Sequence, residues 1–284
     1  PPRVLLVSMC VALFVAGVAT PASAQGSLRP SAESKIDQAL TDALTRGPST
    51  ARVIVTVKAG FRSSIRKSLE RHGDAVKAEE ASTNALVAEI HSEDVRELAG
   101  RDEIESVSFD APVFAHQLNV DPQSRFLAAS RAQQAQSGVQ AVSPSSPLAL
   151  LRTTLGLPIP SGTPTGSGIG VAIIDSGIAP SPDFTITAFF DFTNGGVRQA
   201  RPTDRYGHGT HIAGLIGSNG TLSNREFRGV APAVRLVGLK VLGDTGEGQT
   251  SDVIRALNFV VQYRKSLGVQ IVNLSIGHPI FSPA

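Results

Sequence analysis

The chain has 284 residues, of which 41% are hydrophobic and 18% charged, a composition typical of one to two globular domains. With 26 basic and 24 acidic residues, the formal net charge is only +2, so charge gives no reason to expect nucleic acid as a partner. The single cysteine, Cys10, lies in a segment expected to be removed, and cysteine usage therefore identifies no redox compartment.

Residues 1–24 have the pattern of a secretory signal peptide. Arg3 precedes an apolar run from Val4 to Ala19, and small residues follow at positions 22–24. A membrane anchor is the alternative, but the run is shorter than the roughly 20 apolar residues that span a bilayer. We therefore expect a secreted, extracellular protein, cleaved after Ala24 and free of the membrane afterwards.

Residues 25–50 are polar and are expected to form a loose segment. Residues 51–116 predict a small α+β, ferredoxin-like domain in which strands alternate with helices. The expected elements are a strand at 52–58, a helix at 63–72, a strand at 85–90, a helix opening at Ser92 and a strand at 104–109. Residues 117–150 contain the breaker cluster Ser143–Pro147 and read as a linker, with a short helix expected near 125–135.

Residues 151–284 predict an α/β domain with a parallel sheet. Its apolar runs lie at 169–174, 186–192, 234–242 and 269–274, as expected for strands that are covered on both faces. Between the last two runs, residues 250–267 carry apolar side chains at helical spacing. This order is a βαβ unit, whose helix packs against one face of the sheet.

Asp175 ends the first of these parallel runs, in the sequence Ile-Ile-Asp-Ser-Gly. Open α/β sheets place their active sites at the carboxyl ends of strands, and Gly177 lets the chain turn away there. An aspartate that only caps a turn would fit the same position.

His208 opens a segment that is dense in small residues. Gly209, Ala213, Gly214 and Gly217 would let a helix pack very close to its neighbours, although each glycine weakens the helix by about 1 kcal/mol. The need for a rigid buried helix that presents one imidazole would explain why small residues occur there despite this cost. A structural histidine is one alternative, and a metal site formed with His211 is another, although no third ligand is visible.

The stretch from Gly168 to Gly277 resembles the N-terminal half of a subtilisin-family catalytic domain. Asp175 in Ile-Ile-Asp-Ser-Gly resembles the aspartate motif of the family, and His208 in Gly-His-Gly-Thr-His resembles its histidine motif. The resemblance implies a serine endopeptidase in which His208 is the general base and Asp175 orients it. His211 matches a family histidine that is usually structural.

The resemblance also implies a substrate cleft between two strands. Gly246, Glu247 and Gly248 match one side, and Ser275, Ile276 and Gly277 match the other, with a polypeptide substrate held between them as an added strand. Glycines there are expected to admit a foreign backbone, although a plain surface turn is the alternative for 246–248.

Residues 51–116 resemble the inhibitor-type propeptide of the same family. The resemblance implies an intramolecular partner that assists folding, occupies the cleft and is cut away between residues 111 and 150. The nucleophilic serine and the oxyanion asparagine of the family are absent from the sequence, so this chain alone is expected to be inactive. A truncated or pseudo-protease, with the small domain as inhibitor or folding aid, is the alternative.

No cofactor is expected. Calcium is common in the family and Asp183 resembles one ligand, but no full set of oxygen ligands is visible, so no metal site is predicted. The glycines at 166–170 suggest a nucleotide-binding domain as a further alternative. They precede a strand, however, whereas a dinucleotide fingerprint follows one and opens a helix.

Overall fold

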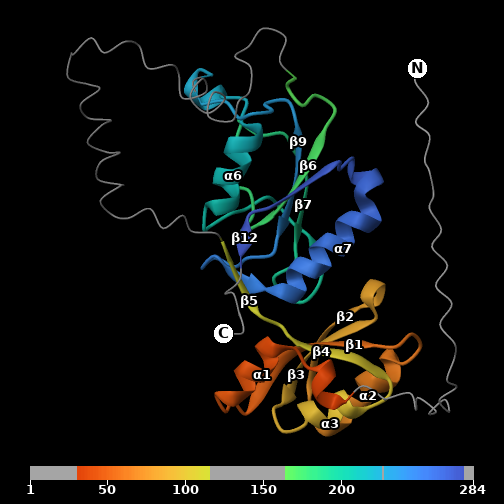
Figure 1. Cartoon of the computed structure of the whole chain (residues 1–284). Coiled ribbons are helices and arrows are strands. Elements are labelled where there is room, and N and C mark those ends of the chain that lie inside the picture. Colours follow the sequence, from red (N-terminus) through yellow and green to blue (C-terminus); the bar gives the residue numbers. More distant parts are fainter. Residues whose placement is uncertain (1–30, 116–163, 226, 278–284) are drawn as a thin grey trace, which may run out of the picture. The chain divides into compact units, whose positions relative to one another are not determined.

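The computed structural model describes residues 31–115, 164–225 and 227–277 (Figure 1). The expected signal peptide and linker lie outside these residues. No helix within the described ranges is long and apolar enough to cross a bilayer.

Residues 31–109 form a small domain built on a four-stranded antiparallel sheet. The strand order is β2-β3-β1-β4, with bounds Thr50–Val57 for β1, Ala75–Glu80 for β2, Ala85–His91 for β3 and Ile104–Phe109 for β4. Strand β1 alternates buried and partly exposed residues, so its buried side chains share one face. The helices α2 (Arg62–His72) and α3 (Val95–Gly100) cover that face with Ile65, Leu69 and Val95.

The sequence predicts a loose segment at 25–50, and this prediction is wrong from Ala32 onwards. A 3₁₀ turn (Ala32–Lys35) and the helix α1 (Gln38–Thr45) form there, and Leu40 is fully buried in the core of the small domain. The Asp37 carboxylate accepts the Leu40 amide at 2.7 Å and the Phe109 amide at 3.1 Å. It thereby caps α1 and ties the helix to β4.

Two further details of the small domain differ from the sequence prediction. Helix α3 begins at Val95, with Asp94 and not Ser92 as its N-cap residue. Strand β2 was not expected because its sequence, Ala-Val-Lys-Ala-Glu-Glu, is poor in β-branched residues. It forms by pairing with β3 at the edge of the sheet, and a 3₁₀ turn (Ala81–Thr83) connects the two strands.

The second part of the chain is an α/β domain with a five-stranded sheet. The order is β11-β6-β9-β7-β8, with bounds Gly170–Asp175 for β6, Ile186–Asp191 for β7, Arg198–Gln199 for β8, Arg235–Lys240 for β9 and Ile271–Leu274 for β11. All neighbours are parallel except β7 and β8. A 3₁₀ turn (Thr221–Ser223) lies between the helix α6 (His208–Gly217) and β9.

Two helices cover opposite faces of this sheet (Figure 1). On β6, Val171 and Ile173 belong to the cluster that includes Ala213 of α6 (His208–Gly217). The alternate residues Ala172 and Ile174 belong to the cluster that includes α7 (Thr250–Leu267). Because successive side chains of a strand point to opposite faces, β6 is the buried centre of a three-layer α/β arrangement.

A third, three-stranded sheet joins segments that lie far apart in the sequence. Strand β5 (Pro112–Ala115), which continues from the small domain, lies between β10 (Glu247–Gln249) and β12 (Ile276–Gly277) of the α/β domain. Both pairings are antiparallel.

Candidate active site

Asp175 and His208 meet at the carboxyl edge of the parallel sheet. Asp175 is the last residue of β6, and His208 is the first residue of α6. The imidazole Nδ1 of His208 lies 2.8 and 2.9 Å from the two carboxylate oxygens of Asp175. The Asp175 side chain has no exposed surface, whereas the His208 side chain is 17% exposed. The pair therefore holds a buried carboxylate behind an imidazole that solvent can reach.

This geometry fixes which ring nitrogen can act as a base. A carboxylate accepts hydrogen bonds, so the N–H group at Nδ1 of His208 donates a hydrogen bond to Asp175. The neutral ring then has its lone pair on Nε2, on the far side from the carboxylate. An imidazole held in this tautomer can take a proton from a hydroxyl group and return it to a leaving group.

The backbone before α6 approaches the Asp175 strand very closely. Gly177 has φ +123°, and a Cβ atom there would lie 2.0 Å from the Thr203 carbonyl oxygen. A Cβ on Gly209 would lie 2.1 Å from the Gly177 carbonyl oxygen and 3.1 Å from Cβ of Asp175. Glycine at both positions is therefore what allows His208 to reach the carboxylate.

The expected role of small residues along α6 holds at three of four positions. Ala213 is fully buried, and a Cβ on Gly217 would lie 2.8 Å from a methyl carbon of Val234. A Cβ on Gly214, by contrast, would meet nothing within 4 Å. Close packing therefore explains Gly209, Ala213 and Gly217 but does not explain Gly214.

We predict that Gly209→Ala destabilises the fold by about 2–3 kcal/mol, because the added methyl group must displace the Gly177 carbonyl and the Asp175 side chain. Gly214→Ala is the matched control on the same helix. It has open space and should gain up to about 1 kcal/mol from helix propensity. Urea denaturation of the two variants measures both effects, and equal midpoints would contradict this account of the packing.

The metal and nucleotide alternatives receive no support from the described residues. His211 is exposed on α6, and within the described ranges neither it nor His208 belongs to a group of three histidine and acidic side chains. Gly166 and Gly168 have positive φ angles and form a turn that leads into β6, not a helix. A dinucleotide would therefore find no helix N-terminus after these glycines.

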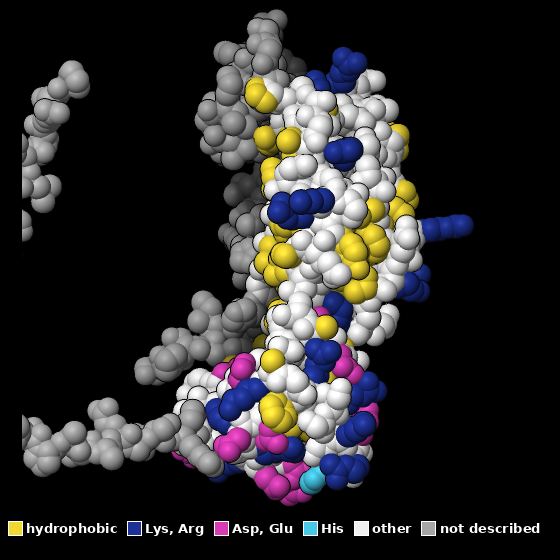
Figure 2. All heavy atoms as spheres, turned by 90° about the vertical axis from the view of Figure 1, so that its right-hand side faces the viewer, with side chains coloured by type: hydrophobic (Ala, Val, Ile, Leu, Met, Phe, Trp, Pro, Cys, Tyr) yellow, Lys and Arg dark blue, Asp and Glu magenta, His cyan; other side chains and the backbone are white. Residues whose placement is uncertain are grey.

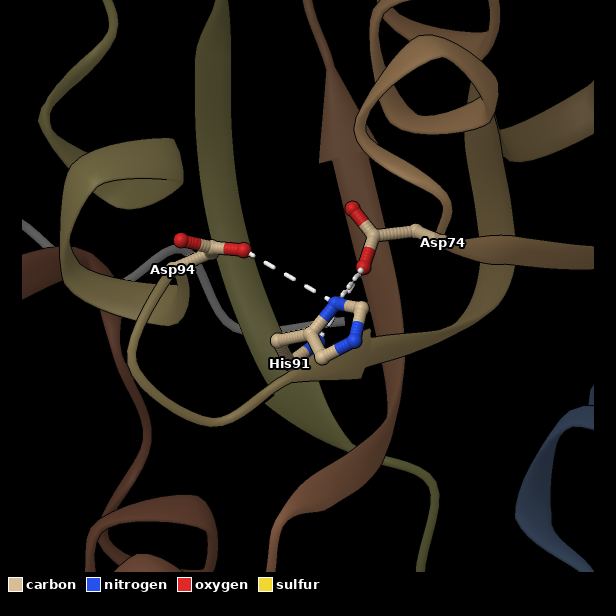
Figure 3. Close-up of side chains that lie close together, drawn as sticks. All are labelled: Asp74, His91 and Asp94. Atoms are coloured by element: carbon tan, nitrogen blue, oxygen red, sulfur yellow. Dashed lines mark hydrogen bonds and ion pairs between the residues drawn. The ribbon is translucent and has the colours of Figure 1, made fainter.

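Within the described ranges, one group of three histidine and acidic side chains comes together, in the small domain (Figure 3). The Nδ1 atom of His91 lies 3.0 Å from Asp74 Oδ1 and 3.9 Å from Asp94 Oδ2. Asp74 Oδ1 also accepts the backbone amide of His91 at 3.1 Å. These bonds tie the start of β2 to the end of β3, which is a sufficient structural role for the group.

Asp183, the residue that resembles a family calcium ligand, is already engaged by the loop beside it. Its carboxylate accepts the Leu222 amide at 2.9 Å and the Ser218 hydroxyl at 3.2 Å. In the part of the chain that the structure describes, it joins no group of three acidic or histidine ligands. These two bonds are a sufficient structural role for the Asp183 carboxylate.

The residues expected to bind substrate border strand β5. Glu247 and Gly248 are register partners of Phe114 and Val113 on one side, and Ile276 and Gly277 are partners of Ala115 and Phe114 on the other. Gly246 accepts the Ala115 amide at 2.9 Å through its carbonyl oxygen. Ser275 immediately precedes β12, and its hydroxyl group accepts a hydrogen bond from Asn273 at 2.9 Å.

Gly246 and Gly248 pack closely against neighbours within the α/β domain. A Cβ on Gly246 would lie 2.4 Å from the Tyr206 ring, and a Cβ on Gly248 would lie 2.3 Å from the Val241 carbonyl oxygen. Internal packing is therefore one reason for glycine at both positions, and their role in admitting a foreign backbone stays a prediction.

Contacts beyond β5 were not visible in the sequence. Asp110 accepts the Ser251 amide at 2.8 Å and the Ser251 hydroxyl at 2.7 Å, so it caps the first turn of α7. Arg255 of α7 bonds Glu80 of the small domain at 2.5 Å and Asp252 at 2.7 Å. The side chains of Arg255, Glu80 and Asp252 are all at least nine-tenths buried.

A buried carboxylate that is hydrogen-bonded to a histidine at the carboxyl edge of a parallel sheet is the arrangement that two members of a serine-peptidase triad require. Residues 166–282 match the subtilase family, peptidase S8. This part of the chain is therefore similar to the subtilase family, and its parallel sheet is that of a subtilisin-like fold.

Curated relatives match the same region. The serine protease AprX of Bacillus subtilis is 38% identical over 120 residues, which make up 40% of this chain and 26% of that protein. Subtilisin Savinase of Lederbergia lenta is 38% identical over 116 residues, 40% of this chain and 39% of that protein. The chain thus spans well under half the length of these relatives.

Solved structures resemble a larger share of the chain. The epidermin leader peptide processing serine protease of Staphylococcus aureus has a TM-score of 0.56 and 16% identity, and the match covers 81% of this chain and 51% of that one. Fervidolysin of Fervidobacterium pennivorans has a TM-score of 0.52 and 17% identity, and the match covers 80% of this chain and 36% of that one. At these identities the likeness concerns the fold alone.

Proposed function

We propose that these 284 residues are the front part of the precursor of a secreted subtilisin-like serine endopeptidase. The observation that carries the proposal is the hydrogen bond of 2.8 Å between Asp175 and His208. In the complete protein, Nε2 of His208 takes the proton of a serine as that serine attacks a peptide carbonyl, and later gives it to the leaving amine. Asp175 keeps the ring in the required tautomer and stabilises the imidazolium.

The serine and the oxyanion asparagine would come from sequence after Ala284. The much greater length of the relatives supports this, because this chain corresponds to only 26% of one and 39% of the other. Strand β11 supports it too: in the described part it pairs with β6 alone, and its Ile271 and Leu274 are 52% and 46% exposed. Apolar side chains at a free strand edge need a further partner.

The small domain would act as an intramolecular propeptide. Strand β5 joins β10 and β12 through main-chain pairing, which is how proteases of this kind hold an extended polypeptide. While β5 occupies this position, another polypeptide cannot. Cleavage between residues 111 and 150 would free the cleft, and a substrate would then take the place of β5.

Expression of the gene with all its downstream sequence, followed by N-terminal sequencing and a peptide-hydrolysis assay, tests this proposal. We expect export with loss of residues 1–24, a mature N-terminus between 111 and 150, and hydrolysis of unfolded polypeptide. A folded product that keeps the small domain and hydrolyses nothing would favour the alternative, a pseudo-protease whose small domain is an inhibitor or folding aid. That alternative predicts inhibition of other subtilases by the small domain.

The contacts between the small domain and α7 predict a pH dependence of stability. Burial raises the pKa of Asp252 to about 6, and Asp110 adds to the increase, although Arg255 opposes it. Between about pH 4 and pH 6 the folded chain therefore keeps a proton that the unfolded chain releases. Stability should fall as the pH rises through this window and level off above it.

We expect the Asp252 contribution to be about 1–2 kcal/mol, after allowance for solvent screening of a shift of this size. Other carboxyl groups titrate in the same window, so the informative quantity is the difference between the wild-type chain and Asp252→Asn. Urea denaturation at several pH values measures it. A difference that does not change between pH 4 and pH 6 would contradict the assignment.

A further inference from the structure

We infer that Asp204 is a positioning residue that fixes Asp175 and His208 relative to each other. This inference deepens the proposed function and rests on it. Asp204 precedes α6 and touches neither the Asp175 carboxylate nor the His208 ring in any bond that the structure contains. It acts through the two segments that carry them.

The Asp204 carboxylate collects four hydrogen bonds. Oδ1 accepts the Ser176 hydroxyl at 2.9 Å and the Gly207 amide at 2.8 Å. Oδ2 accepts both the amide and the hydroxyl group of Thr210, at 2.8 and 2.6 Å. A carboxylate with four donors has all its acceptor positions filled, so its orientation is fixed.

Through Gly207 and Thr210, Asp204 sets the first turn of α6. The N-cap residue of this helix is Gly207, which has φ 95° and no side chain to satisfy the free amides of the first turn. Asp204 satisfies the Thr210 amide, and the Ser176 hydroxyl oxygen accepts the Gly209 amide at 3.0 Å. His208 lies between Gly207 and Thr210, whose amides both donate to the Asp204 carboxylate, so these two bonds determine where its side chain starts.

Through Ser176, the same carboxylate sets the other member of the pair. The Ser176 hydroxyl donates to Asp204, and the Ser176 amide donates to Oδ1 of Asp175 at 2.7 Å. Oδ1 is also one of the two oxygens that His208 contacts. Asp204 is thus linked to both ends of the Asp175–His208 bond, by way of Ser176 on one side and the α6 turn on the other.

The environment keeps Asp204 in the charged form that this role requires. Burial by itself would raise its pKa, but the hydrogen bonds from Thr210, Gly207 and Ser176 outweigh burial and hold the pKa below its ordinary value. A negative charge before the first turn of a helix is also favoured by the helix dipole.

The test is Asp204→Asn, which replaces one acceptor oxygen with an amide donor that faces N–H and O–H groups. We expect nitrogen-15 NMR of this chain to show a mixture of His208 tautomers in the variant, whereas the wild-type ring carries its proton on Nδ1. In the complete protein we expect kcat to fall about 10²-fold with little change in KM. Ser176→Ala keeps the Asp204 bonds to Gly207 and Thr210 but loses the Ser176 bonds to Asp204 and Gly209, and it should shift the tautomers in the same direction.

Val260→Ala is the control for a purely structural effect. Val260 is a core residue of α7, and its truncation lowers stability without touching the Asp204 network. It should leave the His208 tautomer unchanged. A folded Asp204→Asn or Ser176→Ala chain with the wild-type tautomer, or equal tautomer shifts in Val260→Ala, would overturn the inference. The NMR result is independent of hydrolysis, so failure of the proposed function would be recognised separately.

Discussion

Replacement of Asp175 by asparagine should slow peptide hydrolysis by the complete protein about 10⁴-fold. The amide can donate to Nδ1 of His208, so the ring would carry its proton on Nε2 and could no longer accept one there. Self-cleavage of the precursor is the best measurement, because the strand to be cut is already bound. Its single-turnover rate therefore reports the chemical step without a contribution from substrate binding.

Asp191→Asn is the matched control for this prediction. Asp191 also ends a parallel strand, β7, but its carboxylate bonds Thr193 and Arg198 and has no contact with His208. Its replacement should change self-cleavage far less. If the two variants cleave at similar rates, Asp175 does not have the role proposed for it.

Glu80→Ala should destabilise the chain by about 3 kcal/mol and loosen the small domain from α7. Glu80 and Arg255 are 2.5 Å apart with side-chain exposures of only 9% and 8%. Removal of Glu80 leaves the buried Arg255 charge with Asp252 as its remaining partner, and loss of one partner from a buried ion pair costs several kcal/mol. Urea denaturation measures the loss, and hydrogen exchange at the Ala115 amide reports whether β5 has left the cleft.

Glu79→Ala provides the comparison at the preceding residue. Glu79 pairs with Arg62 and Arg66 at the surface, where its side chain is 32% exposed, and pairs of this kind contribute little. We expect a much smaller change in the urea midpoint and unchanged exchange at Ala115. Equal effects of the two substitutions would show that the Glu80–Arg255 contact does not hold the domains together.

The apolar runs of the sequence predict the parallel strands of the α/β domain, whereas the pairing of Asp175 with His208 is expected only from the resemblance to the subtilisin family. The run at 169–174 is apolar at nearly every position because β6 is covered on both faces, so the end of the strand at Asp175 can be located. The small residues after His208 likewise predicted close packing, which Gly209 shows most clearly. Both features are local, so the spacing of apolar residues and the composition of short segments are enough to predict them.

Long-range contacts were not predictable in this way. Glu80 and Arg255 are separated by 175 positions, and Asp110 and Ser251 by 141, so no periodicity connects them. Helix α1 was missed because only two buried side chains, Leu40 and Ala43, and a cap from Asp37 stabilise this short segment. Asp204 did carry a signal, an aspartate four positions before His208, but its partners Ser176 and Thr210 are needed to recognise its role.

Covalent labelling of the complete protein with a fluorophosphonate, a reagent that reacts with activated serines, tests the central claim most directly. We predict labelling of one serine in the processed wild-type protein and loss of that labelling when His208 is replaced by alanine. A correctly folded wild-type protein that stays unlabelled, or labelling that does not depend on His208, would contradict the claim that Asp175 and His208 activate a nucleophile.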